Sequence, residues 1–328
     1  MKRMIGFIIF FCGFLVVAAG FAGSKQKQQA KPLIGILQPM SHPALDAIHR
    51  GIIKGLDESG YPKNAIKVDF QNAQGDQSNL KSMAERFTTE DATVTVGIAT
   101  PAAQALANAN STTPIVLGAV TDPVGAKLVK SNAHPGGNIT GVSDRSPLKA
   151  QLSLIHKLVP HAKTLGIIGT SSDDSAQTQL KQVQQIAPTL GFTVKKYTIS
   201  NTNDLQQVAG QMANAVDAIY VPNDNTIASA MQTLVAAANQ NKVPIFPAAD
   251  TMVDQGGIAT IGLDQFKLGV ETGKMVAQIL KGKKPANYPV HFESTGALVL
   301  NTKVAKQLGI TIPDSLLTQA EKSGRVIK

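Results

Sequence analysis

Short apolar runs rich in β-branched residues alternate with longer helical stretches along this chain. Each run is apolar on both faces and is followed by a helix, a pattern typical of buried parallel strands. The pattern repeats after roughly 125 to 130 residues. We therefore predict an α/β fold of two doubly wound, parallel-sheet lobes joined by a multi-strand hinge. The runs lie at 33–37, 66–70, 94–98 and 115–119, and again at 165–168, 193–197, 218–221 and 243–246.

Helical periodicity predicts the elements between these strands. The stretch 43–59 carries an apolar stripe, and Pro43 suits a first helical turn because its missing N–H is not needed there. Thr100 and Pro101 open a helix that runs to residue 109, and 227–241 is predicted as one helix. Further helices are expected at 78–87, 205–213 and 303–308. A long glutamine-rich helix is also expected in the second lobe, and it ends at residue 190.

The order of elements predicts how the chain divides between the lobes. Residues 121–146 show little periodicity, which indicates a crossover. A helix after the short strand 258–261 is expected to return to the first lobe, so that up to three segments form the hinge. The expected division is 1–31 for targeting and tether, 32–143 plus 264–290 for lobe one, and 144–263 plus 291–328 for lobe two.

The first residues have the composition of a targeting signal. Lys2 and Arg3 precede an uncharged apolar run at 4–23, as in secretory signals. Small residues near its end suit cleavage, yet the run also approaches the ~20 residues that span a bilayer as an uncleaved anchor. We expect an exported protein at the extracellular face of the cytoplasmic membrane, anchored by this helix or released after cleavage.

Composition and charge exclude several classes of protein. Charged residues make up 16% of the 328 residues and hydrophobic ones 43%, which fits two globular domains. The net charge of +9 is scattered with no arginine-rich helix, so we expect a solvated basic face and no nucleic-acid partner. The single Cys12 excludes an intrachain disulfide and a zinc cluster. Because Cys12 lies within the apolar run, we expect it to act as a small apolar residue of that helix and not to be lipid-modified.

The loops that follow the predicted strands carry the candidate ligand contacts. In open parallel sheets, ligands bind beyond the carboxyl ends of the strands, here in the cleft between the lobes. The candidates are Gln38, Ser41, His42, Thr100, Pro101, Ala102, Thr121 and Asp122 in lobe one, and Ser171, Ser172, Asn223, Asp224, Asn225 and Asp250 in lobe two.

The chemistry of these loops suits a zwitterion such as an amino acid. Backbone N–H groups after 100–101 and 171–172 suit a carboxylate, whereas Asp224 and Asp250 suit an ammonium. Each polar candidate also has a structural alternative, since Asn, Asp, Ser and Thr at such junctions are ordinary helix N-caps. The run 223–225 is denser in polar groups than one cap requires.

Motifs of catalysis are missing from the sequence. The six histidines show no metal-ligand spacing, and there is neither a G-x-S-x-G elbow nor a glycine-rich phosphate loop. We therefore predict a binding protein without catalytic residues, metal or cofactor. An extracellular hydrolase and a ligand-binding receptor for a sensor kinase remain alternatives. A transcription regulator of similar fold would carry a basic helix-turn-helix where this chain has its apolar segment.

Six segments together resemble one known family, the substrate-binding lipoproteins of ABC transporters of the tryptophan/tyrosine type. The resemblance covers nearly the whole exported portion and implies the two-lobed periplasmic-binding-protein fold. It implies capture of an amino acid, aromatic and with tryptophan favoured, for a membrane permease driven by a separate ATPase. The segments are 38–46, 99–104, 121–124, 138–142, 220–225 and 309–313.

Three further expectations accompany this resemblance. The family's lipobox cysteine is missing, which favours tethering by the uncleaved helix, and we expect a monomer. A bound aromatic ring would lie among apolar walls, for which position suggests Met40, Tyr220, Phe246 and Phe266.

Overall fold

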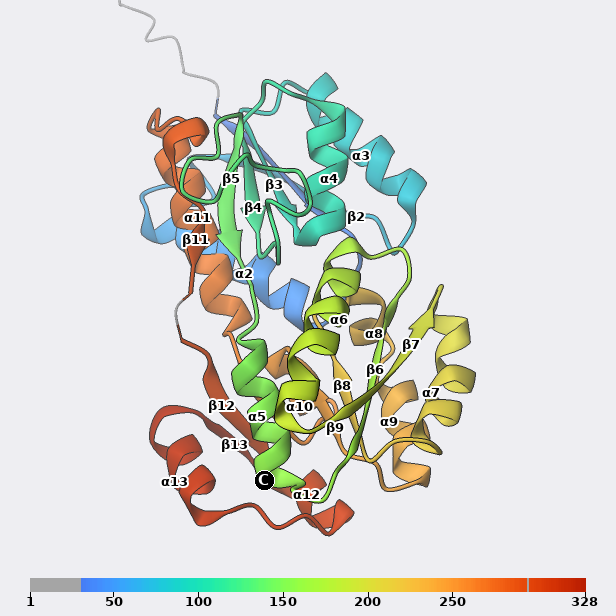
Figure 1. The fold of residues 1–328 in the computed structure, drawn as a ribbon. Helices are drawn as coiled ribbons and strands as arrows, with labels where there is room; N and C mark the ends of the chain where they lie inside the picture. Colours follow the sequence, from blue (N-terminus) through green and yellow to red (C-terminus); the bar gives the residue numbers. More distant parts are fainter. Residues whose placement is uncertain (1–30, 294) are drawn as a thin grey trace, which may run out of the picture. The chain divides into compact units, whose positions relative to one another are not determined.

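The computed structural model describes residues 31–293 and 295–328, of which Pro32–Lys328 form one compact unit (Figure 1). The predicted targeting segment lies outside the described residues, so the statements about it stay predictions. No helix within the described part of the chain is both long enough and apolar enough to cross a membrane.

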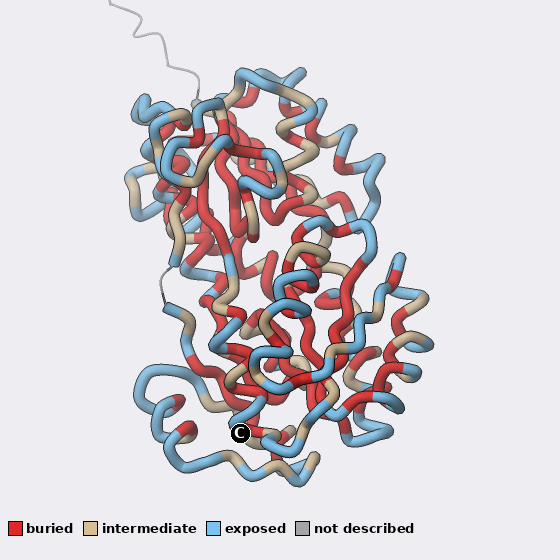
Figure 2. Tube along the Cα trace, in the orientation of Figure 1, coloured by how far each residue is buried: buried red, intermediate tan, exposed pale blue. Residues whose placement is uncertain are grey.

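The first lobe is built on a six-stranded parallel sheet with the order β11-β5-β4-β3-β1-β2. Strands β1, β3, β4 and β5 are buried along their whole length (Figure 2). The prediction of a buried strand at 66–70 is wrong, because β2 lies at the edge of the sheet and has no fully buried residue. The strands are β1 (Leu33–Gln38), β2 (Lys67–Asn72), β3 (Val94–Ile98), β4 (Ile115–Gly118), β5 (Ile139–Ser143) and β11 (His291–Phe292).

Helices cover both faces of this sheet. Because side chains alternate along a strand, Ile34 and Ile36 of β1 pack with α2 and α11, whereas Leu33 and Leu37 pack with α3 and α4. This alternation produces the two core clusters of the lobe. The helices are α2 (Pro43–Glu58), α3 (Gln77–Thr89), α4 (Ala99–Ala109) and α11 (Gln265–Leu280).

The second lobe combines a four-stranded parallel sheet, β7-β6-β8-β9, with a three-stranded sheet, β10-β12-β13. In the smaller sheet β10 and β12 are antiparallel and β12 and β13 are parallel. The strands are β6 (Thr164–Thr170), β7 (Thr193–Ile199), β8 (Ala218–Val221), β9 (Ile245–Pro247), β10 (Ala259–Gly262), β12 (Ala297–Asn301) and β13 (Arg325–Ile327). The helices are α5 (Leu148–Leu158), α6 (Asp174–Ile186), α7 (Leu205–Ala213), α8 (Asn225–Ser229), α9 (Met231–Gln240), α10 (Asp250–Asp254), α12 (Thr302–Leu308) and α13 (Asp314–Ser323). Short 3-10 turns lie at Ala187–Leu190, Thr202–Asp204 and Pro285–Asn287.

Three segments carry the chain between the lobes, in agreement with the predicted hinge. They lie between β5 and α5, between β10 and α11, and between β11 and β12. Because β11 pairs with β5, His291 and Phe292 belong to the first sheet, although the sequence analysis assigned them to lobe two.

Two elements differ from the sequence expectations. The stretch 121–146 is not all crossover, since it contains β5, a short strand whose Gly141 leaves little apolar signal. The helix predicted at 227–241 is broken at Ala230. Just before the break, the Ser229 hydroxyl donates to the Thr226 carbonyl at 2.7 Å, a local bond that competes with the helical pattern.

Helices α2 and α11 lie in direct backbone contact. A Cβ added at Gly55 would lie 2.1 Å from the Val270 carbonyl oxygen, and one at Gly269 would lie 2.1 Å from that of Ile48. Glycine at these positions therefore permits the close approach. The contact attaches α11, which follows β10 of lobe two in sequence, to the first helix of lobe one.

We predict that Gly55→Ala destabilises the protein by at least about 2 kcal/mol, because the new methyl group overlaps a backbone atom that cannot rotate away. Chemical denaturation of the purified protein measures the change. Gly210→Ala in α7 is the matched control, since nothing lies within 4 Å of its added Cβ. That control should stabilise the helix by about 0.5–1 kcal/mol. Equal effects of the two substitutions would contradict the close contact.

Candidate functional site

A small cavity lies where the carboxyl ends of the parallel strands of both lobes meet. It encloses about 30 Å³, well below the ~300 Å³ at which ligand pockets begin. A solute of amino-acid size therefore enters only if the walls move. Its lining residues are His42, Ala44, Leu45, Ile48, Ala99, Thr100, Ala119, Thr121, Asp144, Ser175, Asn223, Asp224, Asn225, Ala228, Ala249, Met252 and Gln265.

Two alanines in the cavity wall have left-handed backbones. Ala99 after β3 has φ 65° and Ala119 after β4 has φ 59°. Such conformations are costly for residues with a Cβ and concentrate at functional sites. Ala99 also begins α4, which has no side-chain cap. The first N–H groups of α4 therefore have no side-chain cap, and the first two residues of this helix, Ala99 and Thr100, line the cavity.

The start of α6 differs from that of α4. The Asp173 carboxylate accepts hydrogen bonds from the N–H groups of Ser175 at 2.9 Å and Ala176 at 3.1 Å. The Ser171 N–H donates to the Ile199 carbonyl at 2.8 Å. The N–H groups of Ser171, Ser175 and Ala176, at the helix start where the sequence predicted a ligand carboxylate, are thus already occupied. Both Ser171 and Ser172 are exposed outside the cavity.

Asp144 joins polar groups of both lobes at the cavity. Its Oδ1 accepts from the Thr121 hydroxyl at 2.8 Å, and its Oδ2 accepts from Asn223 Nδ2 at 2.9 Å. Burial raises the pKa of this carboxyl to about 7. Sequence reasoning missed Asp144 because it follows β5, the strand that was itself missed.

Asp224 is both a helix cap and a cavity residue. It accepts from the N–H of Thr170 at 2.5 Å, from the Thr170 hydroxyl at 2.9 Å, and from the Ile227 N–H at 3.0 Å. Burial, together with the nearby negative Asp173, raises the pKa of Asp224 to about 6. The capping alternative is therefore realised at Asp224 without excluding contact with a ligand.

The cavity contains carboxylates but no fixed cation. Asp144 and Asp224 line it, and among its lining residues in the described part of the chain there is neither lysine nor arginine. Burying negative charge without a partner is unfavourable, which is why both pKa values are raised. A positively charged group placed between these carboxylates would relieve that cost.

His42 connects the lobes from the start of α2. Its Nε2 lies 3.0 Å from Asn225 Oδ1, at the start of α8. Burial lowers the pKa of His42, so the ring is neutral at neutral pH. Its other nitrogen, Nδ1, is buried and has no hydrogen-bond partner within the residues that the structure describes.

Two of the predicted residues shape the loop before α2 instead of lining the cavity. The Gln38 side chain donates to the Met40 carbonyl and to Asp46 Oδ1, both at 2.8 Å. The Ser41 hydroxyl donates to Asp46 Oδ2 at 2.7 Å. These bonds fix the backbone that presents His42.

Other predicted residues lie outside the cavity as well. Ala102 is completely buried in the core beneath α4. Asp122 accepts from the Gly125 N–H at 3.0 Å and lies 3.7 Å from an Arg145 nitrogen. Pro101 and Ser172 line two open grooves of about 840 and 760 Å³ at the mouth between the lobes, and Ser41 lines the smaller one.

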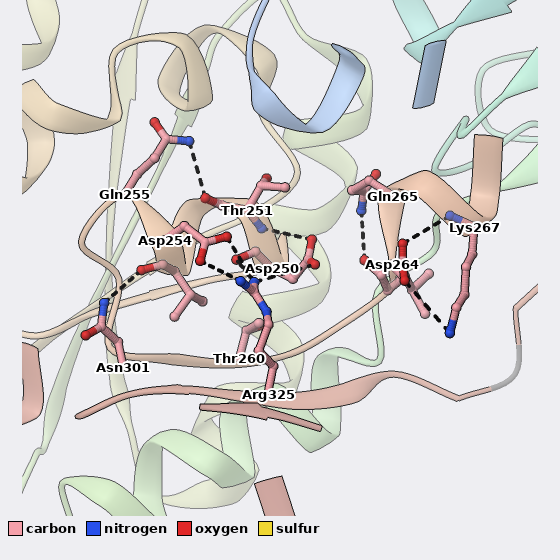
Figure 3. A network of polar contacts seen from close by, with 12 residues as sticks. Asp250, Thr251, Asp254, Gln255, Thr260, Asp264, Gln265, Lys267, Asn301 and Arg325 are labelled. Carbon is pink, nitrogen blue, oxygen red and sulfur yellow. Dashed lines mark hydrogen bonds and ion pairs between the residues drawn. The ribbon is translucent and has the colours of Figure 1, made fainter. Parts of the chain in front are cut away.

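Asp250 takes part in an ion-pair network with the last strand (Figure 3). Arg325 of β13 donates to both carboxylate oxygens of Asp254, at 2.6 and 3.0 Å, and lies 3.8 Å from Asp250 Oδ2. Asp250 does not line the cavity. Its partner, Arg325, is 75 residues away in sequence. The network still bears on the cavity, because Ala249 and Met252 of the same segment line it.

The predicted aromatic walls are wrong. Tyr220 is fully buried in the core and donates its hydroxyl to Gln151 Oε1 at 2.7 Å, and Phe246 belongs to the same core cluster. Phe266 is exposed on α11, and Met40 lines the outer groove. The apolar wall comes instead from Ala44, Leu45 and Ile48 of α2, Ala228 of α8 and Met252 of α10.

We predict that Asp144→Asn stabilises the protein at pH 8 when no ligand is added. The folded pKa of about 7 exceeds the unfolded value of 3.8, so the stability linked to this carboxyl is complete below pH 3.8 and is lost as the pH rises through 7. Asparagine can donate to Thr121 and accept from Asn223 without carrying charge. The gain should be about 1–3 kcal/mol larger at pH 8 than at pH 5, because more of this carboxyl's linked stability has been lost at the higher pH.

Thermal unfolding of both proteins at the two pH values measures this difference. Asp76→Asn is the control, because Asp76 is exposed and hydrogen bonds from Ser78 and Asn79 lower its pKa. A gain for Asp144→Asn that is equal at both pH values would show that charge burial is not its cause.

Comparisons with known proteins place most of the described chain in one family of solute binders. The family model for ABC transporter substrate binding protein matches residues 33–323. The tyrosine-binding protein of Clostridioides difficile (strain R20291) is 37% identical over 276 residues, covering 84% of this chain and 80% of the relative.

Two solved structures allow the arrangement of the lobes to be compared. An ABC domain in complex with L-Trp from Streptococcus pneumoniae is 46% identical with a TM-score of 0.88, covering 91% of this chain and 100% of that chain. A ligand-free, open substrate-binding protein with adhesive properties from Clostridium difficile is 34% identical with a TM-score of 0.69, covering 90% and 99%. The described lobes thus match the L-Trp complex better than the open form.

Proposed function

Because the chain belongs to the family of ABC transporter substrate-binding proteins, we propose that it captures an aromatic L-amino acid, with tryptophan the leading candidate and tyrosine the second. The ligand binds in the cavity between the lobes and is delivered to a membrane permease powered by a separate ATPase. Proteins of this family act outside the cytoplasm and bind solutes without converting them. The predicted N-terminal segment would tether this chain at the membrane.

The observation that carries the proposal is the pair of buried carboxylates without a cation. Asp144 and Asp224 suit an ammonium group, and the uncapped start of α4 at Ala99 and Thr100 suits a carboxylate. The apolar wall from α2, α8 and α10 suits a hydrophobic side chain. An amino acid with a large apolar side chain has all three groups.

Binding must be coupled to movement of the lobes. The cavity is too small to admit an amino acid from solution without a change in its walls. Three crossing segments connect the lobes, so they can separate as rigid bodies. A ligand that contacts both lobes then favours the closed arrangement by its differential contacts.

The likeness to relatives supports an aromatic ligand. One relative is a tyrosine-binding protein, and another was solved with L-Trp. The relative solved with L-Trp has the higher identity, 46% against 37%, which favours tryptophan.

We predict that L-tryptophan fluorescence reports binding directly. The chain contains no tryptophan, so emission excited at the red edge of indole absorption comes from the ligand alone. Transfer of the indole ring into the cavity should give a saturable blue shift. L-Tyrosine should compete, and D-tryptophan should compete poorly because its ammonium and carboxylate cannot reach both sets of partners with the ring in place.

Charge variants test the site in the same titration. Asp144→Asn and Asp224→Asn should each weaken binding by about 2 kcal/mol or more, whereas Asp122→Asn, outside the cavity, should change it little. Affinity should fall from pH 8 to pH 5, because protons compete with the ammonium for carboxyls with pKa values of about 7 and 6. Water-like emission of L-tryptophan at saturating protein, together with a higher melting temperature in another solute, would refute the aromatic ligand.

We also predict that deleting this chain from its host reduces uptake of labelled L-tryptophan at submicromolar concentration. Re-expression should restore uptake, and re-expression of Asp224→Asn should not, since delivery requires capture first. A receptor for a sensor kinase would bind the ligand equally well but leave uptake unchanged. Unchanged uptake with intact binding would therefore contradict delivery while leaving capture in place.

A further inference from the structure

One buried polar atom in the cavity wall has no partner. Five side-chain atoms in the described part of the chain are buried without a hydrogen-bond partner, and His42 Nδ1 is the one whose residue lines the cavity. Unsatisfied buried polar atoms are rare because each forfeits its bonds to water. An atom of this kind in a binding cavity points to a group that the ligand brings.

The chemical character of this atom is set by the other ring nitrogen. Asn225 Oδ1 can only accept a hydrogen bond, so Nε2, 3.0 Å away, carries the ring proton. Nδ1 of the neutral ring is then a lone-pair acceptor. Because Asn225 belongs to the opposite lobe, this tautomer is held when the lobes are together.

The neighbours of His42 indicate which part of a ligand it meets. His42 immediately precedes α2, whose Ala44, Leu45 and Ile48 form much of the apolar wall. The carboxylates that suit an ammonium follow β5 and β8 instead. His42 therefore lies between the apolar wall of α2 and Asn225 of α8, so its free acceptor is available to a donor on a side chain that packs against that wall.

We propose that His42 Nδ1 accepts a hydrogen bond from a donor on the ligand's aromatic ring, an indole N–H or a phenol O–H, and so selects ring-donor amino acids against phenylalanine. This inference rests on the proposed function and adds a specificity-determining residue to it. Phenylalanine would displace water from Nδ1 and offer no donor in return. Asn225 acts as the positioning residue that fixes the tautomer.

The first test uses the unaltered full chain and two ligand pairs. In 3-(3-benzothienyl)-L-alanine, sulfur replaces the indole N–H of L-tryptophan with almost no change of shape. Calorimetric titration should show it binding about 10- to 100-fold more weakly than L-tryptophan, and L-phenylalanine should be similarly weaker than L-tyrosine. Equal affinity within both pairs would overturn the proposal.

The second test removes the acceptor. His42→Leu should bring each pair to within about threefold, mainly by weakening the ring-donor ligands, while binding of L-phenylalanine changes little. Thr226→Ala is the matched control, since Thr226 adjoins Asn225 but lines only the outer groove, and it should retain the discrimination. Full discrimination in His42→Leu would overturn the proposal.

The outcomes separate this inference from the proposed function. If the unaltered protein binds none of these amino acids, the proposed function fails and the inference fails with it. If it binds L-tryptophan and the benzothienyl analogue equally, and also L-tyrosine and L-phenylalanine equally, the inference alone fails. Should His42→Leu lose all binding, the ligand pairs on the unaltered protein still decide the question.

Discussion

The site depends on the backbone contact between α2 and α11. Gly51 and Gly55 of one helix and Gly269 and Gly273 of the other bring the two backbones together. His42, at the start of α2, and Gln265, at the start of α11, therefore both reach the cavity. Since α11 comes directly after β10 of the second lobe, the same contact fixes one of the three hinge segments. A single close packing thus supports both the cavity wall and the connection between the lobes.

The cavity is built at a cost to stability. Asp144 and Asp224 are buried and lack a cation, so the protein alone stabilises their neutral forms, as their raised pKa values show. Thr121, Asn223 and Thr170 hold the carboxylates in place by donating to them. Because the carboxylates are already oriented, little free energy is spent on reorganising the site when a cation binds. The same buried carboxylates therefore lower the stability of the protein without ligand and favour the binding of an ammonium group.

Periodicity was sufficient to predict the long elements, because β1, β3, β6 and α2 each carry a continuous apolar run or stripe. It failed for β5, whose five residues include Gly141. For the site, the carboxyl ends of the strands led to His42, Thr100, Thr121 and the run 223–225. The same rule could not exclude Asp250, because its partner Arg325 is distant in sequence. Nor could it place Tyr220, whose aromatic ring fits a core as well as a wall.

Closure of the lobes is supported by only a few direct polar contacts. His42 meets Asn225 at 3.0 Å, and the Gln104 amide donates to Asp174 at 3.2 Å between α4 and α6. Each such bond replaces bonds to water and contributes only about 1 kcal/mol net. These two bonds alone therefore hold the lobes together only weakly. A ligand that adds an ammonium, a carboxylate and a ring contact between the lobes would then determine which arrangement predominates.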